Sequence, residues 1–189
     1  KTLGVTGNVG GIAPQTISGE LLRVSIPARG AQATLGPVVR NGDVTVWQAL
    51  DGITLSFRNG VLTGTRGLGD DLMSADVSNN ISALLGEHEG YYLHFRTYID
   101  GENRTVFRSF QCRQKPQKPS GENASADGSL LRIEEFCVST DRNFTNSYWL
   151  DNGRRITRSH QWVSPGVGHL ETGRASRPPR NRRTLEITE

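Results

Sequence analysis

The stretch VTVWQALDGITLSFRNGVLTGT, Val44 to Thr65, decides the class of fold. Asp51-Gly52 and Asn59-Gly60 each separate two β-rich runs, and both dipeptides can place two residues at positive φ, as a type I′ turn requires. Between the turns apolar and polar side chains alternate, with Ile53, Leu55 and Phe57 on one face and Thr54, Ser56 and Arg58 on the other. The stretch therefore predicts two consecutive β-hairpins with one buried face.

The same pattern extends outward along the chain. Further β-rich runs cover residues 21–28, 31–39, 91–99 and 144–163, the last around an Asp151-Asn152-Gly153 turn. In the run from 91 to 99, four large side chains share a face: Tyr91, Leu93, Phe95 and Ile99. Residues 66–90 break the β pattern, and within them residues 75–85 predict one short helix with Ser78 or Asn79 as its N-cap.

Strand after strand without intervening helices predicts an all-β fold with at most one or two short helices. The antiparallel meander is expected to curl into a barrel-like or sandwich sheet, which protects its edges. The sequence leaves the choice between barrel and sandwich open.

A chain of 189 residues is expected to form one domain. Residues 1–20 are rich in glycine and predict a flexible lead-in, residues 21–171 a single β domain, and residues 172–189 a basic flexible tail. The tail has two glutamates and five arginines: Arg174, Arg177, Arg180, Arg182 and Arg183. Their balance equals the formal net charge of +3, so the folded part is neutral overall.

That distribution of charge bears on the partner. Nucleic-acid-binding domains carry their basic patch on the fold, so no nucleic-acid partner is expected here. The tail is either a solvated terminus without a partner or a contact for an anionic polymer or an anionic membrane surface.

The two cysteines, Cys112 and Cys137, each end a strand-like run, with a polar loop between them. A disulfide between them closes a loop of roughly 25 residues and stabilises the fold by about 3 kcal/mol. Such a bond indicates an oxidising compartment, such as a bacterial periplasm. Two reduced thiols in a cytosolic protein remain the alternative.

Catalytic and metal-binding patterns are weak. Glu134 and Glu135 are adjacent on a predicted strand, so they point to opposite faces and cannot flank one glycosidic bond. The four histidines lack the close spacing of a zinc pair. We expect no catalytic residues, no metal and no cofactor.

A binding surface has better support. Trp149, Arg158, His160 and Trp162 are candidate glycan-binding residues, because aromatic rings stack on sugars while arginine donates hydrogen bonds. Arg158, His160 and Trp162 alternate onto one face of the last predicted strand. The competing interpretation is ordinary packing, because aromatic residues are favoured in strands.

Two segments carry a family resemblance: VWQALDGITLSFRNGVLTGTRGLGDDLMSAD, residues 46–76, and FTNSYWLDNGRRITRSHQWVSP, residues 144–165. The double hairpin, the Gly-Leu-x-x-Asp-Leu step, Tyr-Trp before a glycine turn, and Ser-x-Gln-Trp resemble the YjbF/GfcB family of group 4 capsule polysaccharide lipoproteins. The motifs cover roughly a third of the chain.

The resemblance implies a lipoprotein on the periplasmic face of the Gram-negative outer membrane. It implies a non-enzymatic part in exopolysaccharide or capsule assembly and export, as a scaffold or a glycan-contacting factor. The partners would be polysaccharide, other envelope export proteins, and the membrane through an N-terminal lipid that this chain does not include. A polysaccharide-processing hydrolase or another carbohydrate-active enzyme is the alternative function. Four Asn-x-Ser/Thr sequons leave a secreted eukaryotic glycoprotein as an alternative source.

Overall fold

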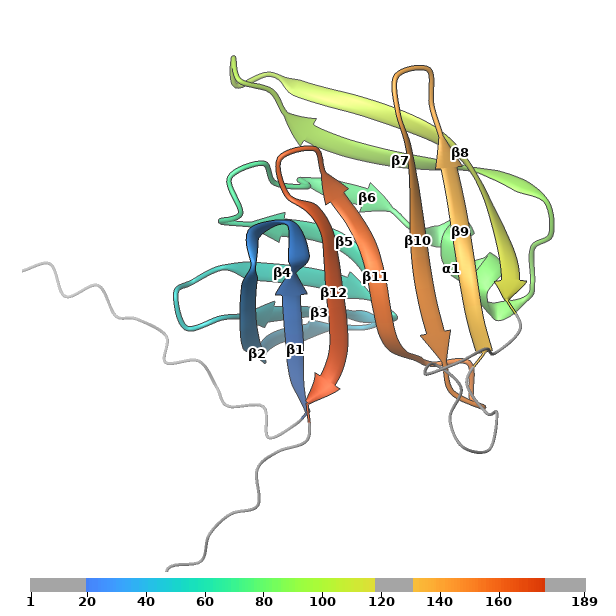
Figure 1. Ribbon diagram of the computed structural model, residues 1–189, viewed down its shortest axis with the longest axis horizontal. Helices are drawn as coiled ribbons and strands as arrows, with labels where there is room; N and C mark the ends of the chain where they lie inside the picture. The colour runs from blue at the N-terminus through green and yellow to red at the C-terminus, as the bar shows by residue number, and fades with distance from the viewer. Residues whose placement is uncertain (1–19, 118–130, 176–189) are drawn as a thin grey trace, which may run out of the picture.

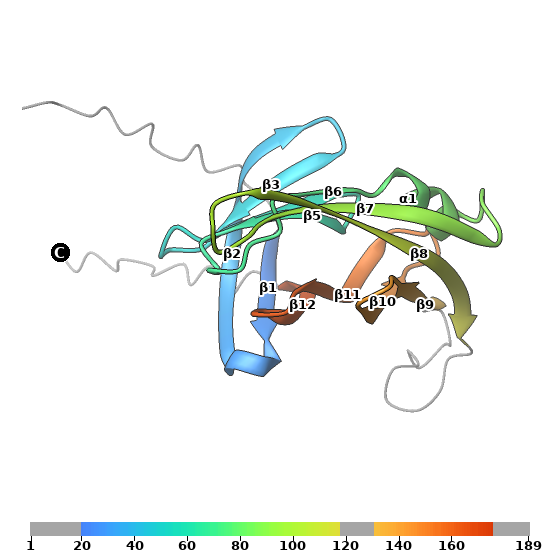
Figure 2. The same ribbon diagram turned by 90° about the horizontal axis from the view of Figure 1, so that it is seen from above.

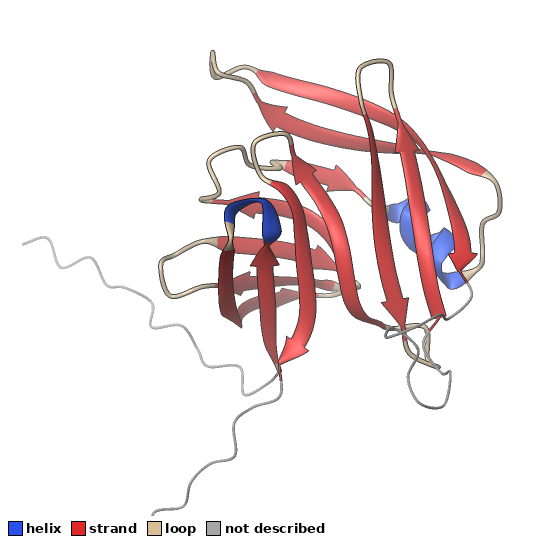
Figure 3. Ribbon diagram, in the orientation of Figure 1, coloured by secondary structure: helices blue, strands red, loops and turns tan. Residues whose placement is uncertain are grey.

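The computed structural model describes residues 20–117 and 131–175, and the predicted lead-in lies outside them. The described part is almost entirely β-sheet with one α-helix and one 3-10 turn, which confirms the predicted class (Figure 3). The elements are β1 (Leu21–Ile26), η1 (Pro27–Arg29), β2 (Ala31–Asn41), β3 (Val44–Gln48), β4 (Thr54–Arg58), β5 (Val61–Arg66), β6 (Ser74–Asp76), α1 (Ser78–Leu85), β7 (Tyr91–Ile99), β8 (Thr105–Gln117), β9 (Leu131–Val138), β10 (Asn143–Leu150), β11 (Ile156–Ser164) and β12 (Gly168–Ala175).

The strands form one antiparallel sheet in the order β5-β4-β3-β2-β1-β12-β11-β10-β9-β8-β7-β6. The sheet curls until β5 meets β6, so strands β5 to β8 lie over strands β9 to β12 (Figures 1 and 2). At this seam the Thr65 amide donates to the Leu72 carbonyl over 2.8 Å, and the Arg66 guanidinium donates to the Leu72 and Met73 carbonyls. The choice left open by the sequence is therefore resolved as a nearly closed barrel.

Gln161 on β11 reaches across the interior to the free edge of β5. Its side-chain oxygen accepts from the Leu62 amide over 2.8 Å, and its amide group donates to the Gly60 carbonyl over 2.9 Å. Because β5 ends the sheet, these backbone groups have no strand partner on that side, and the glutamine satisfies them.

The two hairpins that decide the fold are present as β3–β4 and β4–β5, with Leu55 and Phe57 buried. Asn59 and Gly60 both have positive φ, as a type I′ turn requires. At the other turn only Gly52 has positive φ, and its amide donates to the Ala49 carbonyl, so the expectation of a type I′ turn there is wrong. That loop is a three-residue connection with glycine in the left-handed position.

The helix falls where the sequence placed it, but its cap differs. Val77 occupies the N-cap position, and the Asp76 carboxylate accepts the Ser78 amide over 3.1 Å. Within the described ranges, none of the helices combines the length and apolar character needed to cross a bilayer.

The predicted boundary between the β domain and the basic tail, at residue 172, is wrong, because the next four residues still belong to the sheet. β12 continues to Ala175 and pairs with β1, and Arg174 forms a 3.0 Å ion pair with Glu20. The strand continues because Thr172 and Arg174 still find backbone partners on β1. The other four tail arginines lie outside the described residues.

On strand β7 the large apolar side chains face outward and the polar side chains face inward. Tyr91, Leu93, Phe95 and Ile99 share a face as predicted, yet all four are exposed on the outside of the sheet. The residues that alternate with them point inward and are buried: Tyr92, His94 and Arg96. The interior of this half of the barrel is therefore polar.

Candidate functional site

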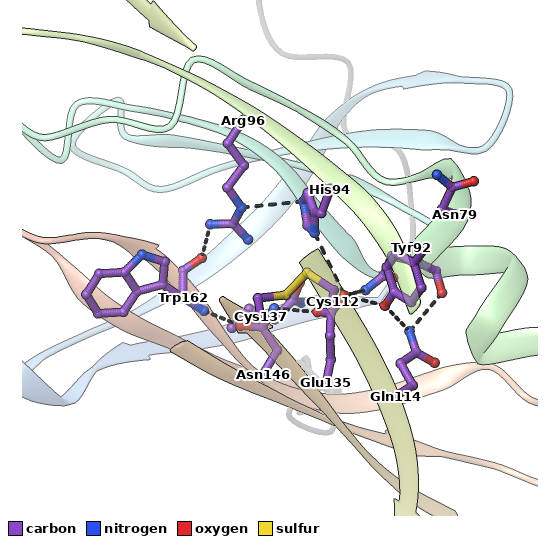
Figure 4. A network of polar contacts seen from close by, with 12 residues as sticks. Asn79, Tyr92, His94, Arg96, Cys112, Gln114, Glu135, Cys137, Asn146 and Trp162 are labelled. Atoms are coloured by element: carbon purple, nitrogen blue, oxygen red, sulfur yellow. Dashed lines mark hydrogen bonds and ion pairs between the residues drawn. A yellow bond between two sulfur atoms is a disulfide. The ribbon is translucent and has the colours of Figure 1, made fainter. Parts of the chain in front are cut away.

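Glu135 on β9 is fully buried and lies at the centre of that polar interior. Its Oε1 accepts hydrogen bonds from Asn80 Nδ2 and the Tyr92 hydroxyl, both over 2.6 Å. Its Oε2 accepts from Asn146 Nδ2 over 2.6 Å and from the Tyr148 hydroxyl over 3.1 Å. Residues from α1, β7 and β10 thus converge on one carboxylate, as Figure 4 shows in part.

These donors decide the ionisation of the site. Burial raises the pKa of Glu135, but the contacts with His94, Tyr92 and Asn146 outweigh it and lower that pKa to about 2. Burial and the neighbouring Glu135 charge raise the pKa of Tyr92 and of Tyr148. The carboxylate therefore stays charged and both phenols stay protonated as donors.

His94 stands between this carboxylate and a buried guanidinium. Its Nε2 accepts from Arg96 Nε over 3.4 Å, so the ring proton lies on Nδ1, 3.8 Å from Glu135 Oε1. Burial lowers the pKa of His94, and the Arg96 charge lowers it further. The imidazole is therefore neutral, and the charges of Glu135 and Arg96 face each other across it.

The disulfide lies against the same network. Cys112 on β8 and Cys137 on β9 are directly paired across the sheet and form the predicted bond, with an S–S distance of 2.01 Å. One ligand atom each from these cysteines, His94 and Glu135 lie within 4.8 Å of one another. With the sulfurs bonded to each other, the cluster offers no thiolate to a metal. Its geometry serves to hold β7, β8 and β9 together.

The polar network also sets the position of Trp162 on β11. The paired positions of β10 and β11 run only from Leu150–Ile156 to Ser147–His160. Beyond that point the Asn146 side chain, which donates to Glu135, accepts the Trp162 amide on its Oδ1 over 2.7 Å. Arg96 donates to the Trp162 carbonyl over 2.7 Å. A side-chain amide and a guanidinium thus replace the missing strand pairing.

The indole of Trp162 is held as well. It stacks on the Phe144 ring with 6.0 Å between centroids and meets the His169 ring edge-on at 5.2 Å. The Arg96 guanidinium lies 4.8 Å from the Phe144 centroid on the other side of this stack of side chains. Trp162 is therefore a preorganised, half-buried aromatic group.

Trp162 borders a cleft of about 180 Å³ at the end of the barrel where β9–β10 and β11–β12 turn. Tyr98 adds a second aromatic ring, and its hydroxyl donates to the Val163 carbonyl over 2.8 Å. Five charged side chains line the cleft, together with four apolar residues: the charged ones are Asp70, Asp100, Arg108, Asp141 and Arg142, and the apolar ones are Ile99, Val106, Phe110 and Pro165. Aromatic faces beside carboxylates and guanidinium groups suit a ligand rich in hydroxyl groups.

The predicted glycan residues do not form one site. Trp149 is 8% exposed, and the guanidinium carbons of Arg158 and Arg132 lie 4.1 Å and 5.3 Å from its ring centroid. Because these groups cover the ring, Trp149 offers little surface for stacking. His160 stacks on His169 with 4.1 Å between centroids. Of the four, Trp162 lines the cleft described above.

The two neighbouring glutamates do point to opposite faces, as predicted. Glu134 bonds with Arg132 on the outside at 2.6 Å, whereas Glu135 is inside. The Glu135 network was missed by the sequence analysis, because its members come from four separate elements and only the polar residues on β7 and β10 hint at it.

The family motifs are mostly structural. In the Gly-Leu-x-x-Asp-Leu step, the Asp71 carboxylate accepts from the Thr65 hydroxyl and from the Gly67 and Leu68 amides. Leu68 and Leu72 are buried in the largest core cluster. The motif therefore fixes the connection that closes the barrel seam.

Fold and site together define a disulfide-bonded, nearly closed antiparallel β-barrel with a buried polar network in one half of its interior and a cleft at one end. Residues 14–174 match the model of the family described as "Group 4 capsule polysaccharide lipoprotein gfcB, YjbF", and the chain belongs to this family. It is therefore a member of a capsule-associated lipoprotein family that is not known for an enzymatic activity.

Among solved structures, the chain is similar to the crystal structure of the hypothetical lipoprotein YmcC from Escherichia coli (K12). The identity is 15%, the match covers 87% of each chain, and the TM-score is 0.62, so the similarity is one of fold. A comparison with curated proteins gave no significant match.

Proposed function

We propose that this protein is a non-enzymatic component of capsule or exopolysaccharide assembly and export, and that it contacts the glycan at the cleft beside Trp162. It acts on the periplasmic face of the Gram-negative outer membrane, held by an N-terminal lipid outside this chain. Membership of a capsule polysaccharide lipoprotein family supports the process and the anchoring. The disulfide supports an oxidising compartment.

The observation that carries the glycan contact is the fixed indole of Trp162 at a cleft lined by charged groups. The cleft volume of about 180 Å³ is smaller than the roughly 300–1,000 Å³ of sites for drug-sized ligands. A cleft of this volume suits one sugar residue of a long polysaccharide. Arg108 and Asp141 lie 3.5 Å apart at its rim and present both a donor and an acceptor to sugar hydroxyls.

The state of the buried carboxylate supports a role without catalysis. General acid catalysis needs a carboxyl group with a raised pKa, whereas that of Glu135 is lowered and all its acceptor positions face donors. Glu134, on the other face, is ion-paired with Arg132. Neither glutamate is suited to glycoside hydrolysis.

Polysaccharide and other envelope export proteins are the proposed partners. Arg177, Arg180, Arg182 and Arg183 remain candidate contacts for an anionic partner. Pull-down from envelope extracts with and without residues 176–189 tests this: recovery of export proteins should fall without them, and unchanged recovery removes the tail from the proposal.

Isothermal titration of purified capsule polysaccharide into the protein tests the glycan contact. Arg142→Ala alters the rim of the cleft, whereas Arg23→Ala removes an exposed arginine on β1 that does not line the cleft. The first variant should bind at least about 5-fold more weakly and the second should bind like the wild type. Equal binding by all three proteins, or no binding by any, overturns the proposed contact.

A further inference from the structure

A second and larger cavity, of about 440 Å³, opens at the opposite end of the barrel from the cleft of Trp162. The β2–β3, β4–β5 and β10–β11 turns surround it, together with the last turn of α1. In antiparallel strands the β10–β11 turn lies at the other end from the β9–β10 and β11–β12 turns that frame the cleft (Figure 1). The two hollows are therefore separate sites.

The deep part of this cavity is apolar. Its apolar lining residues are Leu22 on β1, Trp47 on β3, Phe57 on β4, Ile81 and Leu84 on α1, and Ile156 on β11. Leu85 at the end of α1 also lines the cavity and is 44% exposed. A cavity of this size with several apolar lining residues suits a ligand with a hydrocarbon part.

The mouth is basic. Four arginines line the cavity against only two carboxylates, those of Glu20 and Asp43. Glu20 pairs with Arg174 at 3.0 Å, and Asp43 pairs at 2.6 Å with Arg58, which does not line the cavity. Arg155 pairs at 2.9 Å with Asp151, which does not line it either, so Arg40 and Arg154 are the lining arginines whose charge is not balanced by these pairs. The remaining charge at the mouth is therefore positive.

The β-sheet register places basic and apolar side chains of the lining next to one another. Arg40, Thr45 and Phe57 are paired positions on β2, β3 and β4, so their side chains form one row on the same face. Arg174 is likewise the paired position of Leu22. Each of the two rows thus joins an arginine of the lining to an apolar side chain of the lining.

We propose that this cavity binds a single-chain anionic amphiphile, with its hydrocarbon chain against Leu22, Phe57 and Ile81 and its phosphate or carboxylate at Arg40 and Arg174. Guanidinium groups bind both kinds of anionic head group through charge-assisted hydrogen bonds. The lining differs from that of the Trp162 cleft, where three carboxylates and two arginines are mixed with aromatic rings. The site does not depend on the glycan contact proposed above.

Titration of the intact protein with oleoyl lysophosphatidic acid, below its micelle concentration, tests the site by calorimetry. Oleoyl lysophosphatidylcholine has the same chain without a net charge and should bind at least about 10-fold more weakly. Glycerol 3-phosphate has the head without the chain and should give no measurable heat. Oleate, which carries a carboxylate, should bind, and this arm shows whether the site requires phosphate. Equal binding of both lysolipids, or no binding of lysophosphatidic acid, overturns the proposal.

Single and double variants test whether lysophosphatidic acid binds in this cavity. The double change Arg40→Gln and Arg174→Gln should weaken lysophosphatidic acid binding at least about 10-fold, whereas Arg23→Gln, on the outer face of β1, should leave it unchanged. Leu85→Gln should weaken binding about 3-fold or more, and Leu93→Gln, an exposed leucine on β7, serves as its control. Thermal unfolding of each variant verifies that it is folded. Wild-type affinity in the double variant, or equal losses in a variant and its control, contradicts the site.

Discussion

The phenolic oxygen of Tyr92 lies 2.6 Å from Oε1 of Glu135, and both groups are buried. Tyr92 comes from β7 and Glu135 from β9, with β8 and its half of the disulfide between them. This bond is one of four that hold a charged carboxylate inside the barrel, and the same network reaches Trp162 through Asn146. The stability of the barrel and the position of the cleft are thus linked through Glu135.

Replacing Glu135 should destabilise the fold strongly. Glu135→Gln turns an amide donor toward groups that themselves donate, and we expect a loss of about 3 kcal/mol in the free energy of unfolding. Glu134→Gln is the matched control, since it changes the neighbouring residue on the outer face, and should cost less than about 1 kcal/mol. Urea unfolding measures both, and equal losses would contradict the role of the network.

The same carboxylate predicts a pH dependence. Because the pKa of Glu135 is lowered from 4.5 to about 2 in the fold, its contribution to stability is complete above about pH 4.5 and is lost as the pH falls through 2. The difference in unfolding free energy between wild type and Glu135→Gln should therefore shrink between about pH 5 and pH 2. A difference that stays constant over this range argues against a charged Glu135.

His94 acts in a higher pH range. Burial lowers its pKa below 6.5, so the unfolded chain takes up its proton first and stability falls as the pH drops below about 6.5. Burial also lowers the pKa of His160 and His169, which add to the same trend. Removing one of the three groups, as in His94→Gln, should make stability less dependent on pH between about 6.5 and 5. An unchanged slope would show that His94 is not neutral in the fold.

Breaking the disulfide should cost about 3 kcal/mol, because the bond between residues 25 apart restricts the unfolded chain. Thermal unfolding with and without dithiothreitol measures the effect. The double variant Cys112→Ala and Cys137→Ala should unfold like the reduced wild type and show no response to reductant. A wild-type protein insensitive to reductant would contradict the bond.

The inverted face of β7 gives another test. Leu93→Thr should change the unfolding free energy by less than about 0.5 kcal/mol, because Leu93 is 52% exposed. Tyr92→Phe, one position earlier, loses the bond to Glu135 and should cost about 1–2 kcal/mol. A larger loss for Leu93→Thr than for Tyr92→Phe would mean that Leu93, and not Tyr92, faces the interior of the barrel.

The sequence predicts what is decided locally. The Asn59-Gly60 turn follows from two residues that tolerate positive φ, and the meander follows from strands separated by short turns. The alternation of residues in β7 predicts a strand, but it does not predict which face is buried. The polar face points inward there because its side chains join the buried network, whereas the apolar face of a strand is usually the buried one. Closure at the seam also depends on contacts between distant residues, such as Gln161 with Leu62.

The candidate site was only partly predictable for the same reason. Trp162 carries its own signal, as an aromatic residue beside a turn, but the arginines that cover Trp149 come from other strands. Arg174 looks like part of a basic tail in the sequence, yet it pairs in the sheet and borders the larger cavity. Such juxtapositions arise from strand register across the barrel.

The most direct test of the glycan contact is hydrogen–deuterium exchange of the protein with and without purified capsule polysaccharide. We predict slower exchange in the segments that frame the cleft, residues 98–106, 139–142 and 162–166, and no change in the β10–β11 turn at residues 151–155. Protection confined to that opposite turn, or no protection anywhere, would contradict a glycan contact at Trp162.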